Sequence, residues 1–443
     1  MSNGLDFIED SNSNFQLFDM AAKTNSRAGH EGQVLVEEKA FVRTLTLNRP
    51  RQLNALSSQM ISRLLELFTA YEDDSNVKLI IVKGKGRAFC AGGDVAAVVH
   101  EMNKGKWRLG AEFFRKEFIL NYLLATYSKP QVSILNGIVM GGGAGVSIHG
   151  RFRVATEKSV FAMPETALGL FPDIGASYFL SRLPGFFGEY VGLTGSRLDG
   201  AEMLVCGLAT HFVPSTRLSL LEEALCKANS SDPAIISSII DEYSQQPSLK
   251  EQSAYRRFDH RLLDLRLSMN VLQYARERYT SNKLIKELNW VTHFVIQLDV
   301  IDKCFSQRTV EEILSALERE AIYKTDDWIT STIQTLKKAS PMSLKIWLRS
   351  IREGRLEGVG QCLIREYRMV CHVLRGEVSK DFAEGCRAIL LDKDRNPKWN
   401  PSRLELISDD MADLYFSKVD DEDWKDLKLP ARSSLPVSAM AKL

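Results

Sequence analysis

The amino-acid sequence predicts an α/β core followed by a helical C-terminal region. In the first half of the chain, short β-branched runs alternate with amphipathic helical patterns, a rhythm typical of layered α/β folds. From about Gly185 onward the periodic segments are mostly helical. The length of 443 residues and the hydrophobic content of 44% suffice for a buried core over about two to three domain-sized units.

The elements of the first half follow one another at short intervals. Residues 33–47 contain two alternating β-branched runs around a polar turn, which predicts a β-hairpin. Apolar residues at helical spacing predict helices at 57–74 and 107–127. Short apolar runs predict strands at 77–86 and 129–137, so strands and helices alternate along this part of the chain.

The second half is predicted to be built from amphipathic helices. One helix is expected to begin near Asp199 and to end at Gly207, because glycine commonly terminates a helix. Four further amphipathic patterns predict helices at 309–320, 328–340, 340–354 and 363–376. No repeat of about 20 to 50 residues is found, so a solenoid or a propeller is not expected.

Composition argues against several classes of function. The net charge is +1 and the basic residues are scattered, so no nucleic-acid partner is expected. The seven cysteines include no C-x-x-C pair and the seven histidines form no cluster, so neither a redox pair nor a metal site is predicted. No apolar run reaches the ~18 residues of a membrane span. The N-terminus lacks the basic and apolar regions of a secretory signal.

Two glycine-rich turns follow predicted strands. The segment GRAFCAGGD spans Gly86 to Asp94, and NGIVMGGGAG spans Asn136 to Gly145 and opens an expected helix. Glycine leaves backbone N–H groups uncovered, and such groups can stabilise an oxyanion. Neither segment matches a dinucleotide or P-loop pattern. Plain tight turns are the alternative, but two such turns together could supply two donors to one oxygen.

Two carboxylates bracket the apolar segment PETALGLFPD. Glu165 stands near its start and Asp173 at its end. A carboxyl group beside an apolar wall has its neutral form favoured, which raises its pKa into the range useful for acid–base chemistry. Two carboxyl groups in unequal environments can also divide roles. The alternative is capping, with Glu165 in a first helical turn and Asp173 as the N-cap of the helix that follows.

Two other polar residues near these segments are not expected to be catalytic. His149 lies four residues after Gly145 and is interpreted as a packed core histidine. Cys90 lies beside the first glycine turn without a basic neighbour in the sequence, so it is interpreted as small core packing.

Three segments together resemble the crotonase (enoyl-CoA hydratase/isomerase) superfamily. They are FCAGGD at 89–94, NGIVMGGGAG at 136–145 and FAMPETALGLFPDIGASYFLSRLPG at 161–185. Within the superfamily the chain is most similar to 3-hydroxyisobutyryl-CoA hydrolases of the plant peroxisomal kind. The resemblance covers about 33–257 and about 298–418, and LDVIDKCFSQRTVEEIL and LLDKDRNPKW are also specific to the hydrolases.

The resemblance implies a crotonase-like spiral of ββα turns and an acyl-CoA thioester as substrate. By motif position, the amides of Gly93 and Gly142 would form the oxyanion hole around the thioester carbonyl oxygen. The segment from Ala91 to Asp94 is similar to the part that lines the adenine end of CoA in relatives. Because CoA is part of the substrate, no separate cofactor is implied.

The resemblance also implies roles for three carboxylates. Glu165 matches the catalytic glutamate of the superfamily, and Asp173 matches the second carboxylate of the hydrolases. Glu117, in RKEFILN, falls at the position of a further substrate-contacting glutamate of the hydrolases. The alternative for Glu117 is a place on a solvated helix face.

One departure from the family pattern bears on the reaction. Similar enoyl-CoA hydratases carry a second glutamate two residues after the glycine triplet, where this chain has Gly145. Hydration needs two carboxyl groups to move protons across the double bond, and one of that pair is missing. The expected activity is therefore hydrolysis of 3-hydroxyisobutyryl-CoA in valine breakdown. The alternatives are an enoyl-CoA hydratase or isomerase, and a catalytically impaired CoA-binding homologue.

The impaired alternative arises from an insertion within the expected organisation of the chain. About 40 residues, 258–297, intervene where the family normally passes almost directly. A poorly packed insertion from an alternative transcript is one hypothesis for them. The expected organisation is a disordered segment at 1–30, the crotonase-like core at 31–228, a helical connection with the insertion at 229–300, a C-terminal helical region at 301–425 and a flexible tail at 426–443.

The last residues predict a destination. Ala441, Lys442 and Leu443 form a conservative variant of the S-K-L peroxisomal signal. The Pro/Ser-rich segment before them would let an import receptor reach the signal. The expected localisation is therefore the peroxisome, with the import receptor as a partner. Crotonase relatives are often trimers or hexamers, which leaves a homo-oligomer open.

Overall fold

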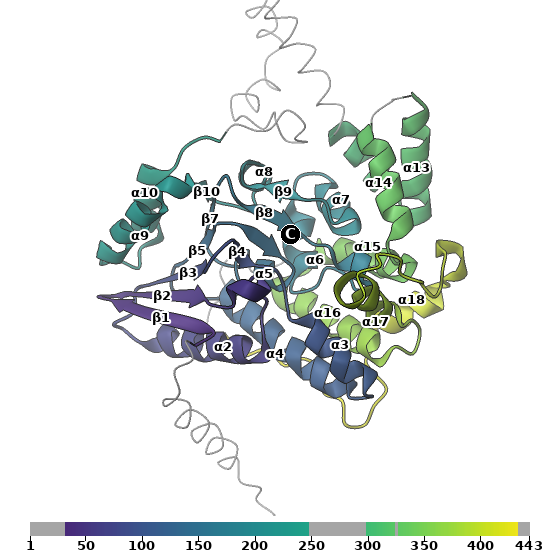
Figure 1. The fold of residues 1–443 in the computed structure, drawn as a ribbon, viewed down its shortest axis with the longest axis horizontal. Coiled ribbons are helices and arrows are strands. Elements are labelled where there is room, and N and C mark those ends of the chain that lie inside the picture. Colours follow the sequence, from purple (N-terminus) through teal and green to yellow (C-terminus); the bar gives the residue numbers. More distant parts are fainter. Residues whose placement is uncertain (1–31, 248–297, 324–326, 433–443) are drawn as a thin grey trace, which may run out of the picture.

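A computed structural model describes residues 32–247, 298–323 and 327–432, and it confirms the α/β core and the helical C-terminal region (Figure 1). The main sheet has the strand order β1-β2-β3-β5-β7-β10. β1 and β2 form the expected antiparallel hairpin, and the other neighbours pair in parallel. The strands are β1 Val34–Lys39, β2 Val42–Leu47, β3 Leu79–Gly84, β5 Gln131–Leu135, β7 Phe152–Ala155 and β10 His211–Phe212.

A second, smaller sheet runs beside the first with the order β4-β6-β8-β9. Its strands are β4 Ala88–Cys90, β6 Ile138–Met140, β8 Val160–Ala162 and β9 Leu198–Asp199. Strands β3, β5 and β7 each continue into the next strand of the smaller sheet. Each turn of the chain therefore adds one strand to each sheet before a helical segment, which is the ββα spiral that the family resemblance implied.

Helices of the core surround this spiral. Helices α2 and α4 pack on each other, and α3 packs on α4. The structure assigns α2 Ser58–Asp73, α3 Val95–Asn103, α4 Trp107–Ala125, α5 Gly142–Gly145, α6 Ala176–Phe179, α7 Phe187–Thr194, α8 Gly200–Cys206, α9 Leu218–Lys227 and α10 Pro233–Tyr243, with 3-10 turns η1 Pro50–Gln52, η2 Glu165–Leu168, η3 Leu180–Arg182 and η4 Ser215–Arg217.

The C-terminal helices share one hydrophobic core with the spiral. Helix α16 lies along α4, where Arg115 donates a hydrogen bond of 2.7 Å to the Tyr367 hydroxyl. The elements are α13 Val310–Tyr323, α14 Asp327–Lys338, α15 Pro341–Gly354, α16 Val359–Arg375, α17 Asp381–Cys386, a π-helical turn η7 Arg387–Leu391, η8 Leu404–Leu406 and α18 Asp409–Phe416.

Helix α17 packs directly on η2, the turn that carries Glu165. A Cβ on Gly169 would lie 2.2 Å from the carbonyl carbon of Asp381, and one on Gly385 would lie 2.3 Å from the carbonyl oxygen of Leu168. The buried carboxylate of Asp381 accepts hydrogen bonds from the Ser340 hydroxyl at 2.6 Å and the Asn400 amide at 2.9 Å. The C-terminal region is therefore fixed against the turn that carries Glu165 by backbone contact.

The structure differs from the expected organisation in several places. The helix after the glycine triplet is only the four residues of α5, and β9 and β10 are two-residue strands too short to show a period. Residues 426–432 belong to the packed structure rather than to a flexible tail. Leu427 is buried, and Arg432 pairs with Glu72 at 2.7 Å. Segments 1–30 and 258–297 and the end of the chain at 441–443 lie outside the described residues.

The contact between η2 and α17 predicts a large stability cost for a small substitution. Gly169 has φ +71°, so Gly169→Ala combines left-handed strain with a clash on the α17 backbone. We expect it to lower the free energy of unfolding by about 3 kcal/mol or more, measured by chemical denaturation. Gly207→Ala is the matched control, because Gly207 has φ +87° with nothing within 4 Å of its added Cβ. A control cost of about 1 kcal/mol is expected, and equal costs would contradict the interpretation.

Candidate active site

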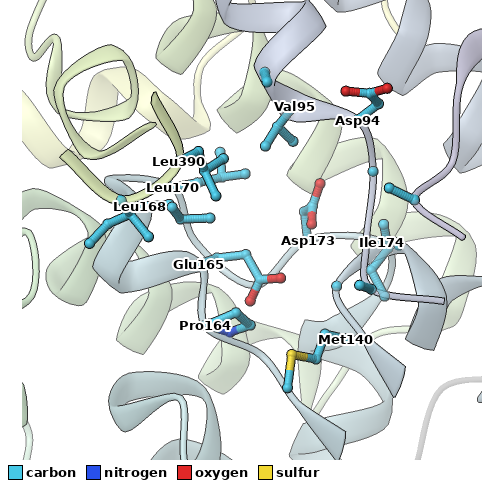
Figure 2. A pocket seen from close by; sticks show the side chains of 18 of the residues that line it. Asp94, Val95, Met140, Pro164, Glu165, Leu168, Leu170, Asp173, Ile174 and Leu390 are labelled. Carbon is cyan, nitrogen blue, oxygen red and sulfur yellow. The ribbon is translucent and has the colours of Figure 1, made fainter. Parts of the chain in front are cut away.

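A cavity of about 400 Å³ lies where the two glycine turns meet η2 and the π-helical turn η7. Figure 2 shows Glu165 and Asp173 directed into this cavity, with Leu168, Leu170 and Leu390 gathered along another side. Its lining also includes Ala91, Gly93, Asp94, Glu117 and Gly142, so the structure brings together every site residue that the sequence predicted.

The two glycine turns place two free amides side by side. A Cβ on Gly142 would lie 3.1 Å from the Gly93 nitrogen, so these two residues are in direct proximity. Within the described part of the chain, neither N–H donates to a backbone carbonyl. A Cβ on Gly142 would also lie 2.4 Å from Glu117 Oε1, which explains why this position needs glycine. The pair can donate to one oxygen, as an oxyanion hole requires.

Three carboxyl groups face this cavity without a basic partner. Glu117, Glu165 and Asp173 expose only 1%, 6% and 4% of their surface, and none of the described residues that line the cavity is Lys, Arg or His. Among the described residues, Glu117 Oε1 and Glu165 Oε2 have no hydrogen-bond partner. Glu117 is therefore not on a solvated helix face. Buried polar atoms without partners are rare in proteins and here face a cavity that could hold a substrate.

Burial determines the protonation of these carboxyl groups. Burial, and to a smaller extent the charge of Glu117, raise the pKa of Glu165 to about 8. Burial also raises the pKa of Glu117. The pKa of Asp173 is raised by burial and by the charges of Glu117, Glu165 and Glu366. Because each negative charge discourages the next, the groups can divide into an ionised base or nucleophile and neutral hydrogen-bond donors.

The capping alternative is wrong for Asp173. Helix α6 has Gly175 at its N-cap and no side-chain cap. Glu165 does stand in the first turn of η2, but one of its oxygens remains without a partner. Both side chains instead point into the cavity (Figure 2).

Gly145 lies against side chains that leave no room for another residue. A Cβ at this position would lie 2.7 Å from Asn121 Nδ2 and 3.0 Å from Ile174 Cβ. Asn121 is fully buried, and Ile174 follows the catalytic Asp173 candidate in the chain. The place that a second hydratase glutamate would occupy is thus filled by other groups, and not only vacated by the glycine.

The structure also shows the surroundings of Asp94, Cys90 and His149. The Asp94 carboxylate lies at the cavity and pairs with Arg49 at 3.0 Å. Cys90 is fully buried, and burial raises the pKa of its thiol to about 12, which agrees with a packing role. His149 is also buried, and its Nε2–H donates to the Ile174 carbonyl at 2.7 Å. Burial lowers the pKa of His149 to about 4, so the ring is neutral.

The lining residues that the sequence did not predict include two from the C-terminal region. Ile389 and Leu390, in η7 of the C-terminal region, close one side of the cavity. The motif LLDKDRNPKW, which begins at Leu390, was a specific family signal, but nothing in it indicates contact with a site about 220 residues earlier.

The described residues contain neither a candidate metal site nor a candidate membrane span. No group of three or more His, Cys, Asp or Glu in them is arranged to hold a metal ion. None of the helices described is both long and apolar enough to cross a membrane.

Comparisons with known proteins agree with this geometry. The family model described as enoyl-CoA hydratase/isomerase matches residues 42–265 and 252–416. 3-Hydroxyisobutyryl-CoA hydrolase 1 of Arabidopsis thaliana is 67% identical over 93% of this chain and 98% of its own length. Probable 3-hydroxyisobutyryl-CoA hydrolase 3 of the same plant is 64% identical over 91% and 97%. The crystal structure of a carnitinyl-CoA dehydratase from Mycobacterium thermoresistibile, 30% identical, matches 91% of this chain and 100% of its own with a TM-score of 0.73.

The raised pKa of Glu165 predicts how stability depends on pH. The folded state holds the proton up to about pH 8, whereas the unfolded carboxyl releases it near 4.5. The free energy of unfolding therefore falls as the pH rises through this window. The Gln side chain does not ionise, so Glu165→Gln removes this loss of stability. The free energy of unfolding of the variant should exceed that of the wild type by a few kcal/mol at pH 8 and by little at pH 4.5. Denaturant unfolding across this range measures the difference.

Glu72→Gln is a control in which the free energy of unfolding should change in the opposite direction. Partial burial raises the pKa of Glu72, but hydrogen bonds from Arg432 and Ser128 outweigh it and lower the pKa. Removing this carboxylate should therefore destabilise the protein near neutral pH. A Glu165→Gln variant that is less stable than the wild type at pH 8 would contradict the buried, unpaired state of Glu165.

Proposed function

The chain belongs to the enoyl-CoA hydratase/isomerase family, and on that basis we propose that it hydrolyses 3-hydroxyisobutyryl-CoA to 3-hydroxyisobutyrate and CoA, a step of valine breakdown. The observation that carries this proposal is the replacement of a second hydratase glutamate by Gly145, with Asp173 placed in the same cavity as Glu165. Relatives at 61–67% identity carry the hydrolase name.

The thioester carbonyl would be polarised by the amides of Gly93 and Gly142. As the carbonyl carbon becomes tetrahedral, its oxygen gains negative charge and strengthens both hydrogen bonds. One such donor is typically worth about 3–4 kcal/mol of barrier. Both N–H groups are free before substrate binds, so no hydrogen bond has to be broken to provide them.

Glu165 would supply the reactive carboxylate. In its ionised form it either attacks the carbonyl carbon to form a mixed anhydride, which water then hydrolyses to the acid and the free carboxylate, or removes a proton from the attacking water and passes it to the departing thiolate. The leaving group is the CoA thiolate in both routes. Asp173 would hold the substrate hydroxyl or assist the water, and Glu117, behind the oxyanion amides, would contact the acyl group.

The alternatives carry less support. The filled space around Gly145 opposes an enoyl-CoA hydratase, because no second carboxyl group can project from that position. The impaired homologue rests only on the insertion at 258–297, which lies outside the described residues. The cavity, both amides and all three carboxyl groups are assembled without it.

Peroxisomal localisation and the import receptor stay predictions. They rest on Ala441, Lys442 and Leu443 alone. A fluorescent protein fused ahead of the last residues of this chain should enter peroxisomes, and deletion of the three residues should leave it in the cytosol. A homo-oligomer likewise stays a prediction.

The reaction is tested by one assay on the full chain. Incubation with 3-hydroxyisobutyryl-CoA should release free thiol, whereas incubation with crotonyl-CoA should leave the enoyl chromophore intact. Loss of the chromophore would indicate a hydratase, and no reaction with either ester would indicate a non-enzyme.

Glu165→Gln should lower the rate of thiol release by about 10²–10⁴-fold, because the amide can act neither as base nor as nucleophile. Binding of the CoA ester, measured by calorimetry, should survive, since the cavity walls are unchanged. Full activity of this variant would end the assignment of Glu165. Oxygen-18 from labelled water found in Glu165 after a single turnover would select the anhydride route.

A further inference from the structure

The turn that follows Asp173 has a strained backbone. Ile174 has φ +57°, in the left-handed region that β-branched residues rarely adopt, and Gly175 follows with φ +81°. Strain of this kind costs about 1–3 kcal/mol and persists only where the surroundings hold it. Ile174 is bonded to Asp173, whose carboxylate points into the cavity (Figure 2), so a shift of this turn would also move that carboxylate.

One side chain from the C-terminal region holds this turn. Glu366, on α16, is fully buried and does not line the cavity. One of its oxygens accepts the Gly175 amide at 2.6 Å, and the other accepts the Ser177 amide at 3.0 Å and the Ser177 hydroxyl at 2.6 Å. A single carboxyl group thus accepts three hydrogen bonds from the turn. Hydrogen bonds to a carboxylate are strong, so this group can hold the backbone of the turn in place.

His149 also holds this turn. Its Nε2–H donates to the Ile174 carbonyl at 2.7 Å, and a Cβ on Gly175 would lie 2.7 Å from His149 Cε1. Glu366 is the acceptor whose loss would leave buried N–H groups unsatisfied and release the strain at Ile174.

We propose that Glu366 is a positioning residue for the reaction: it holds the strained Ile174–Gly175 turn and thereby directs the Asp173 carboxylate at the substrate. The inference rests on the proposed function, because it assumes that Asp173 acts in thioester hydrolysis. Glu366 is separated from the substrate by this turn, so its effect must pass through Asp173.

The test is a double-mutant cycle with Glu366→Gln and Asp173→Asn, using 3-hydroxyisobutyryl-CoA. The Gln side chain has an NH₂ group in place of one carboxylate oxygen. This NH₂ group faces either the Gly175 amide or the Ser177 amide, so one hydrogen bond of the turn is lost. We expect kcat to fall at least tenfold with KM changed less than threefold. The double variant should be no slower than Asp173→Asn alone. An unchanged kcat, or a loss that multiplies fully with that of Asp173→Asn, would overturn the proposal.

Glu189→Gln is the matched control for a merely structural role. Glu189 is also fully buried, is held by Arg355 at 2.7 Å and does not line the cavity. Its variant should lower the melting temperature while kcat stays within twofold. If this control also lost kcat tenfold, the effect of Glu366→Gln would be explained by general destabilisation, and the proposal would be overturned.

A milder variant keeps the test decisive if Glu366→Gln does not fold. Ser177→Ala removes the hydroxyl bond to Glu366 and keeps both amide bonds. It should lower kcat about two- to fivefold, and this loss should vanish in the Asp173→Asn background. A loss that persists there would reject the role of Glu366. A wild type that releases no thiol would instead reject the proposed function.

Discussion

The burial of three carboxyl groups in one cavity without a cation is the constraint on which the rest of the structure depends. Glu117, Glu165 and Asp173 cannot all ionise there, because each charge is poorly solvated and repels the others. Such an arrangement opposes folding, so the surrounding protein must supply the stability. Beside these groups lie the amides of Gly93 and Gly142, whose free N–H groups can donate hydrogen bonds to an oxyanion.

The C-terminal helices supply much of this support. Helix α17 meets η2 at Gly169 and Gly385 with almost no space between backbones, so the turn with Glu165 has one position. Helix α16 contacts the turn that follows Asp173 through Glu366. The turn η7 adds the apolar side chain of Leu390 to the cavity wall. The spiral alone therefore holds only part of the site.

The choice between hydration and hydrolysis is made by volume as well as by residue type. Asn121 and Ile174 lie close beside Gly145, so a glutamate at this position would require these side chains to shift. Ile174, whose backbone is left-handed, lies beside Gly145 and is also bonded to Asp173. The residue next to Gly145 and the second carboxyl group therefore belong to one turn.

The sequence by itself determined the hairpin, the main strands and helices, both glycine turns and the identity of Glu165, Asp173 and Glu117. These features follow from local periodicity, from glycine spacing and from motifs that resemble a family. The strand β9 escaped it, because two residues show no period, and the helix expected after the glycine triplet is only the four residues of α5. Only the tertiary structure decided that Glu117 faces the cavity, that Asp173 is no helix cap, that Leu390 lines the cavity and that Glu366 binds the turn after Asp173. The last two facts depend on contacts between segments about 200 residues apart, whose pairing is set by packing in three dimensions and leaves no signal in either segment alone.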